Sequence, residues 1–265
     1  MKRLLGKAWQ RQALALFVSL AAWEAAGRLG ALNPFFLPPP SAVGRVLIEL
    51  FAEGEGRIWI HLSATFSAAL LGLAAGIAAG ALLGLASAVA PPLAEALVPV
   101  MVLLNAIPRV ILAPLFVIWL GIGLESKIAL AFILVAVIMF FAVYSGIRDV
   151  DRRLIERVRT LGGGRWVLLR EVYAPSVAAW VLGAMKVAVG FAFTGAVVGG
   201  CACRGGGGGE FVASSRGLGY LLSFAQSTYN AALSLALVFL VIAFVVVLFG
   251  LAGALERRLL RWKYR

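Results

Sequence analysis

The sequence predicts an all-α membrane protein with six transmembrane helices. Two observations indicate this class. Of the 265 residues, 62% are hydrophobic and the mean hydropathy is +0.98, and the apolar residues lie in long runs separated by charged loops. Such values are typical of polytopic membrane proteins rather than of soluble domains. The net charge of +12 does not indicate nucleic-acid binding, because the basic residues gather in alternate loops.

The predicted elements follow one another along the chain. A basic tail at residues 1–11 precedes a first transmembrane helix at 12–30 and an outer connector at 31–60, which carries a short amphipathic helix. A core of five further spans occupies residues 61–252, and a basic tail at 253–265 ends the chain. The five core spans are expected at about 61–90, 94–120, 128–146, 176–199 and 231–251.

Two of these spans have unusual compositions. The span at 61–90 has a glycine every four residues, at 72, 76, 80 and 84. This spacing either lets a second helix approach closely or reflects a compositional bias. The span at 94–120 is broken by Pro99, Pro108 and Pro114, so its freed carbonyls must face protein or water.

The distribution of Lys and Arg predicts the orientation. Six spans place both termini on the same side of the membrane. The two tails and the charged loop at 148–175 together hold sixteen Lys and Arg residues, whereas the opposite side holds six. The positive-inside rule therefore places both termini and this loop in the cytoplasm.

The loop at 148–175 is the most charged stretch, with seven arginines and four acids. Asp149 or Asp151 can cap a helix there. Its apolar face consists of Leu154, Ile155, Val158 and Leu161. Glycines at 162–164 should end this helix, and a second amphipathic piece should end at Pro175. The loop is either a solvated positive-inside segment or a docking element for a soluble partner.

The spacing of three residues in this loop matches a known family. Glu156, Gly162 and Pro175 keep the spacing of the EAA loop of bacterial ABC importer permeases, which this loop resembles. Arg157 and Ala174 depart from the Ala and Leu of that pattern, and Val158 replaces a second Ala. The chain from about 33 to 263 resembles the permeases of nitrate, sulfonate and taurine importers. Three stretches carry this resemblance: NPFFLPPPSAV, NAIPRVILAPLFVIWLGIGLESK and SSRGLGYL.

The resemblance implies a MetI-like type I ABC importer permease fold, multi-pass in the bacterial cell (inner) membrane. It implies a homodimer, ABC ATPase subunits bound to the two loops, and a periplasmic or extracellular substrate-binding protein. In this scheme Glu156 pairs with a partner cation and Gly162 permits the sharp turn. The apolar residues Leu154, Ile155, Val158 and Leu161 bury into the ATPase or pack on the permease's own helix ends, and Pro175 completes the loop.

The sequence lacks the patterns of an enzyme. It contains no Gly-rich phosphate loop with Lys-Ser/Thr and no His/Glu metal pattern, and its spans lack converging polar groups. We therefore expect no catalytic residue, metal site or cofactor, with ATP hydrolysis in a separate partner subunit. Two rival classes remain: a secondary transporter or channel, and a membrane scaffold that keeps the permease fold without transporting.

Arg109 and Lys186 are the candidates for the transport pathway. Both are ionisable residues within predicted spans, and such residues usually face the protein interior. Their charge suits a small anion such as nitrate, taurine or an aliphatic sulfonate. Alternatively, either residue extends to an interface or bonds a carbonyl freed by proline. The resembling family also moves uncharged and mixed-charge organics, including pyrimidine vitamin precursors.

One segment does not fit its surroundings. Residues 199–209, GGCACRGGGGG, appear as an insertion of about nine residues relative to the resembling permeases. Consecutive glycines disfavour a helix by about 1 kcal/mol each relative to Ala. The segment is a flexible outer loop, an aberrant insertion, or a Cys-x-Cys metal or redox site, although two thiols alone do not complete a zinc site.

Overall fold

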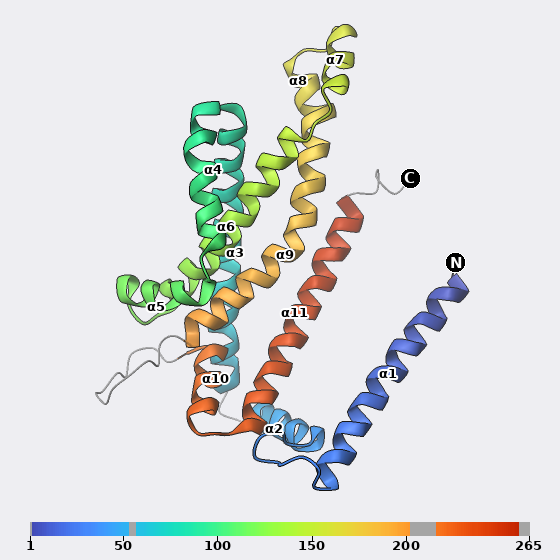
Figure 1. Cartoon of the computed structure of the whole chain (residues 1–265), viewed down its shortest axis with the longest axis vertical. Helices are drawn as coiled ribbons and strands as arrows, with labels where there is room; N and C mark the ends of the chain where they lie inside the picture. Colours follow the sequence, from blue (N-terminus) through green and yellow to red (C-terminus); the bar gives the residue numbers. More distant parts are fainter. Residues whose placement is uncertain (1, 53–56, 202–215, 260–265) are drawn as a thin grey trace. The chain divides into compact units, whose positions relative to one another are not determined.

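The computed structural model describes residues 2–52, 57–201 and 216–259, and this part of the chain is built of helices, as predicted (Figure 1). The helices are α1 (Lys2–Arg28), α2 (Pro40–Ala52), α3 (Arg57–Val89), α4 (Pro91–Ala106), α5 (Arg109–Leu120), α6 (Leu124–Arg148), α7 (Arg152–Thr160), α8 (Arg165–Leu168), the π-helical turn η1 (Leu169–Tyr173), α9 (Ala174–Cys201), α10 (Leu218–Ser227) and α11 (Ala231–Leu259).

Most of the predicted spans coincide with helices that can cross a membrane. Four described helical stretches are long and apolar enough: Ile58–Val89, Leu124–Arg148, Trp166–Gly200 and Ala231–Gly250. A fifth crossing results where the bent pair of α4 and α5 counts as one span. The predicted first span at 12–30 lies almost wholly in α1, but α1 is not among these helices. The sixth crossing therefore stays a prediction.

The third predicted span is not straight. It consists of α4 and α5, which meet at an angle of 109°. Ile107 ends α4 with an extended backbone, at ψ 128°, because the ring of Pro108 disfavours a helical conformation for the residue before it. Pro99 and Pro114, by contrast, lie inside their helices. Only one of the three predicted breaks therefore separates two helices.

The chain divides into two units, which are described separately. One consists of Met1–Trp59 and Leu221–Ile242, and the other of Ile60–Tyr220 and Ala243–Arg265. In the first unit, Glu24 of α1 accepts a hydrogen bond from the backbone N–H of Ser41, at 2.9 Å. Because the first N–H groups of a helix have no partner within it, this carboxylate caps α2, the predicted amphipathic helix.

In the second unit, α6 forms the centre of the core. Ala131, Val135 and Met139 on α6 have no measurable exposure. The glycine stripe of α3 lies against this helix: a Cβ on Gly76 would lie 2.7 Å from the Cβ of Val135 and 2.9 Å from the carbonyl oxygen of Phe132. The structure therefore confirms the interpretation that the stripe allows close approach.

The helix α9 also packs against α6 through a glycine. Gly195 of α9 is so close to α6 that a Cβ there would lie 2.7 Å from the Cα of Ala131. Helices packed through glycine bring their backbones together without an intervening layer of side chains. The three helices α3, α6 and α9 thus share one tightly packed interface, to which Phe193 and Phe66 contribute an edge-to-face pair at 5.2 Å.

Candidate functional site

The charged loop forms a short helix, α7, with a defined start and end. Of the two residues predicted to cap this helix, Asp151 does so. Its carboxylate accepts a hydrogen bond from the backbone N–H of Arg153, at 2.9 Å. Gly162 follows the last turn with a φ of +78°, a left-handed conformation that glycine adopts at little cost. The N–H of Gly162 bonds the carbonyl of Arg159, and that of Gly163 bonds the carbonyl of Val158.

This pair of hydrogen bonds is the Schellman motif, which satisfies the last carbonyls of a helix. Gly163 also has no room for a side chain, because a Cβ there would lie 2.5 Å from Cγ1 of Val158. The predicted turn at 162–164 is therefore confirmed. Its first two glycines are needed for different reasons. Gly162 is required for its backbone angle and Gly163 for the closeness of Val158.

The predicted apolar face of α7 divides into two parts. Leu154 is 48% exposed and Leu161 is 87% exposed, whereas Ile155 and Val158 are half-buried. Glu156 and Arg157 are exposed. Two large apolar side chains and several charges thus remain uncovered on a helix in which no residue is buried. Such a surface is suited to a partner rather than to the chain's own core.

The prediction that Pro175 ends the second amphipathic piece is wrong. The helix continues through η1 into α9, and Trp166–Gly200 forms one long span. Proline lacks an N–H and its ring clashes with the carbonyl four residues earlier. The π-helical turn immediately before it, in which the N–H of Ala174 bonds the carbonyl of Leu169, widens the helix at that point. This widening accommodates Pro175 without ending the helix.

The hairpin is attached to the ends of α6 and α9 (Figure 1). The hydroxyl of Ser176 donates to the carbonyl of Gly146 at 2.8 Å. A Cβ on Gly146 would lie 3.1 Å from the Cα of Val177. The two helices between which the hairpin extends are therefore joined to each other at its base.

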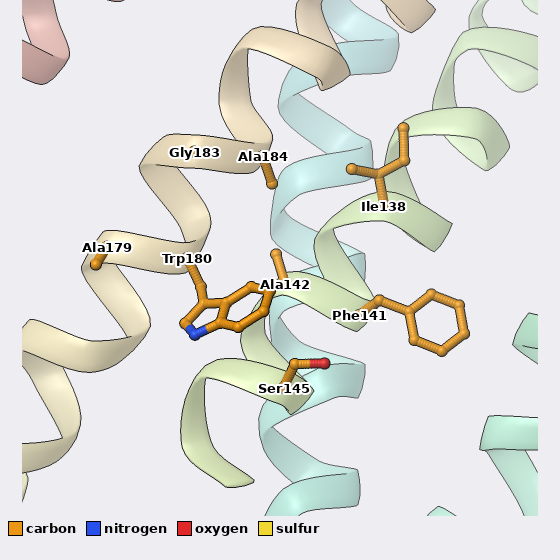
Figure 2. Close-up of a pocket in the computed structure, with 8 residues that line it drawn as sticks. All are labelled: Ile138, Phe141, Ala142, Ser145, Ala179, Trp180, Gly183 and Ala184. Atoms are coloured by element: carbon orange, nitrogen blue, oxygen red, sulfur yellow. The ribbon is translucent and has the colours of Figure 1, made fainter. Parts of the chain in front are cut away.

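A groove of about 520 Å³ opens between α6 and α9 (Figure 2). Its lining is apolar apart from Ser145 and the indole N–H of Trp180, and it contains no charged side chain. Trp180 is 44% exposed. The remaining lining residues are Ile138, Phe141, Ala142, Ala179, Gly183 and Ala184. The sequence alone did not indicate this groove, because its residues look like ordinary span residues.

Of the two predicted pathway cations, Lys186 is not among the residues that line this groove. Arg109 is the first residue of α5, and its side chain lies outside the described part of the structure. Lys186 is exposed on α9, and its Cε would lie 3.9 Å from a Cβ placed on Gly253 of α11. A shared pathway role of Arg109 and Lys186 therefore stays a prediction. The segment at 199–209 also lies mostly outside the described residues, because α9 ends at Cys201 and the description resumes at Arg216.

Comparison with known proteins identifies the family. The family model of the binding-protein-dependent transport system inner membrane component matches residues 72–261, which include α7 and the groove. The chain belongs to this family. It is the permease subunit of an ABC importer, as the resemblance of the charged loop implied.

Similar permeases are named for different substrates. The riboflavin transport system permease protein RibX of Chloroflexus aurantiacus is 37% identical over 94% of this chain and 88% of its own length. The taurine transport system permease protein TauC of Escherichia coli is 30% identical over 93% of this chain and 87% of its own length. The family is thus established, but these names do not agree on one substrate.

A solved structure supports the fold. A chain of the MetNI methionine ABC transporter, in an inward-facing conformation, aligns with a TM-score of 0.54 and 21% identity, over 77% of this permease and 93% of that chain. The predicted MetI-like fold is therefore confirmed. At this identity the likeness concerns the fold alone.

Proposed function

We propose that this permease forms the transport pathway as a homodimer and that a separate ABC ATPase subunit binds α7 of each copy. The observation that supports this proposal is the uncovered face of α7, where Leu154 and Leu161 are exposed beside charged residues. In this arrangement Glu156 pairs with a cation of the ATPase. Ile155 and Val158 hold α7 to its own hairpin, and Pro175 belongs to its attachment on α9.

The orientation follows from the same proposal. The loop that carries α7 and both basic tails lie in the cytoplasm, in agreement with the excess of Lys and Arg on that side. A substrate-binding protein then docks at the opposite end of the spans, in the periplasm or outside the cell. ATP binding brings the two α7 helices together, and the movement passes through the ends of α6 and α9.

Exchange of one exposed leucine tests the docking surface. Burial of a Leu side chain contributes about 1.5–3 kcal/mol, so Leu161→Ala should weaken ATPase binding roughly tenfold or more. The measurement is recovery of the ATPase with the purified permease. A suitable control is Leu29→Ala, because Leu29 is similarly exposed, at 83%, but lies far from α7 in sequence. Equal recovery from both variants would contradict the docking role.

The groove supports an organic substrate with a flat ring as the first candidate. Trp180 exposes its indole in a lining without charge, and aromatic pairs contribute about 0.5–1.5 kcal/mol beyond the area that they bury. The similarity to a permease named for riboflavin points in the same direction. An uncharged or mixed-charge heteroaromatic compound, such as a flavin or a pyrimidine vitamin precursor, therefore fits this groove best.

A small anion is the second candidate. Lys186 follows Ala179 and Gly183 of the groove by seven and three residues, which is the spacing of one helix face. Lys186 thus lies about one turn along α9 from the groove, and a relative is named for taurine, which carries a sulfonate. Arg109, the other predicted pathway residue, would add a second positive charge.

One experiment decides between these substrates and tests the importer function. The permease is reconstituted with the ATPase and the binding protein encoded beside it, and ATP hydrolysis is measured with riboflavin, a pyrimidine vitamin precursor, taurine, an alkanesulfonate and nitrate in turn. Stimulation by one compound supports the importer and identifies its substrate. A complex that forms but responds to none of them would instead support a scaffold that has kept the permease fold.

A further inference from the structure

A buried lysine lies at the end of the spans opposite α7. Lys127, on the first turn of α6, is only 3% exposed. Its ammonium group donates to the backbone carbonyl of Arg216, in the turn that precedes α10. Removal of an ammonium group from water is expensive unless hydrogen bonds compensate for it. The contact therefore constrains where this turn can lie.

Two side chains of α3 hold the same turn from another direction. The backbone N–H of Gly217 donates to Nδ1 of His61 at 3.0 Å, and that of Leu218 donates to the hydroxyl oxygen of Thr65 at 2.9 Å. His61 and Thr65 are four residues apart and so occupy one face of α3. The carbonyl oxygen of Gly217 also lies 3.3 Å from this Nδ1, so the ring contacts both backbone groups of Gly217.

Gly217 makes these contacts possible. Its φ is +123°, which residues with a Cβ rarely adopt. A Cβ there would also lie 3.0 Å from Nζ of Lys127 and 3.2 Å from the hydroxyl oxygen of Thr65. The next part of α10 is held as well, because the rings of His61 and Tyr220 stack with centroids 6.0 Å apart and an angle of 4°.

These residues form one structure, which we call the outer anchor: His61, Thr65 and Lys127 together with the turn at 216–218. Each of the three turn residues contributes one backbone group, and each group is bonded to a different side chain. The side chain of Arg216 itself remains exposed. The turn thus directs its backbone towards the protein and leaves the side chain of Arg216 available to a partner.

The position of Lys127 connects the outer anchor to the opposite end of the permease. α6 is a continuous helix from Leu124 to Arg148, 25 residues long. At a rise of about 1.5 Å per residue it extends over roughly 37 Å. The outer anchor is attached at its start, and α7 follows directly after its end.

We propose that His61, Thr65 and Lys127 are positioning residues that fix the 216–218 turn as part of the docking surface for the substrate-binding protein and couple that surface to α6. This inference rests on the proposed importer function. When the binding protein presses on the anchored turn, α6 moves with it, and the movement reaches α7 and the ATPase. A turn that is not anchored would bind the partner poorly and would absorb the movement.

Substitution of Thr65 tests the proposal with a matched pair. Thr65→Val keeps the shape and removes the acceptor for Leu218, whereas Thr65→Ser keeps the acceptor. ATP hydrolysis by the reconstituted complex is measured as a function of the concentration of the liganded binding protein, relative to the basal rate of the same preparation. For Thr65→Val we expect the half-saturating concentration to rise about tenfold, which corresponds to ~1.4 kcal/mol, with a smaller fall in the maximal rate. Thr65→Ser should restore the wild-type value.

Substitutions of Lys127 provide a second test, and a substitution of Ser67 provides the control. Lys127→Met should raise the half-saturating concentration at least as much as Thr65→Val, and Lys127→Arg should recover part of it. Ser67→Ala is the control, because the Ser67 hydroxyl bonds the carbonyl of Ala64 within α3 itself. Co-purification of the ATPase shows that each variant assembles.

The outcomes separate this proposal from the importer function. Wild-type half-saturation in both Thr65→Val and Lys127→Met overturns the outer anchor as a positioning device. So does a loss of basal and stimulated hydrolysis by the same factor, because the residues would then act only on folding. If the wild-type complex itself shows no stimulation by any binding protein, the importer function fails instead.

Discussion

Gly162 offers the sharpest test of the docking helix. Its φ of +78° lies in the left-handed region, yet a Cβ placed there meets no atom within 4 Å. A substitution at this position is therefore opposed by backbone conformation and not by crowding. For an L-residue the left-handed conformation is unfavourable by roughly 1–2 kcal/mol, whereas Asn and Asp tolerate it better.

The length of α7 makes this amount decisive. The helix has nine residues, none of them buried, and isolated helices shorter than about 12–15 residues are marginal in water. A loss of ~1–2 kcal/mol at its end should therefore unwind the last turn, which holds Leu161 in place. Gly162→Ala is expected to reduce ATPase recovery several-fold, and Gly162→Asn should retain most of it.

Gly162→Asp adds a charge to the shape of Asn. A carboxylate at the C-terminus of a helix is unfavourable by about 0.3–1 kcal/mol, and here it also enters the docking surface. We expect the Asp variant to insert normally in the membrane but to lose ATPase association and coupling. ATPase recovery and substrate uptake, measured for the three variants together, check this reasoning. Wild-type uptake and recovery in both the Ala and the Asp variants would refute the role of α7.

Three further predictions concern other parts of the permease. Gly80→Ala should lower the midpoint of thermal unfolding in detergent, because its Cβ would lie 2.9 Å from the Cβ of Met139 and overpacking is unfavourable by about 1–3 kcal/mol; Gly44→Ala, where nothing lies within 4 Å, should not lower it. Deletion of residues 202–209 should preserve transport, because the outer anchor and the packing of Gly200 beside Gly219 lie outside the deleted segment; a clear loss of uptake would show that the insertion is functional. Trp180→Ala should impair import of a flat aromatic substrate, whereas Lys186→Met should impair import of an anion, and uptake assays with each substrate class distinguish the two.

The sequence predicted those features that depend on local chemistry. Asp151 and Gly162 delimit α7 because capping and left-handed turns are properties of a few neighbouring residues. The bend before Pro108 follows equally from one residue and its neighbour. Long apolar runs indicated the spans for the same reason, since hydropathy is a sum over consecutive residues.

Features that depend on distant residues could not be predicted. Trp180 is one of many apolar residues in its span, and only the packing of α9 beside α6 places it in a groove. His61 is the single histidine of the sequence, and its partner Gly217 is 156 residues away, so no local pattern indicates their contact.

The packing of α6 explains why such distant residues can act together. Glycines of α3 and α9 lie against it, so that backbone meets backbone at Gly80 and at Gly195. Flexible side chains between helices can absorb a small displacement by changing rotamer, but a contact through glycine has no such layer. A shift of α6 at Lys127 must therefore carry its neighbours with it or separate the helices. Close glycine packing thus favours movement of these three helices as one body, which is what a coupled importer requires between its outer surface and α7.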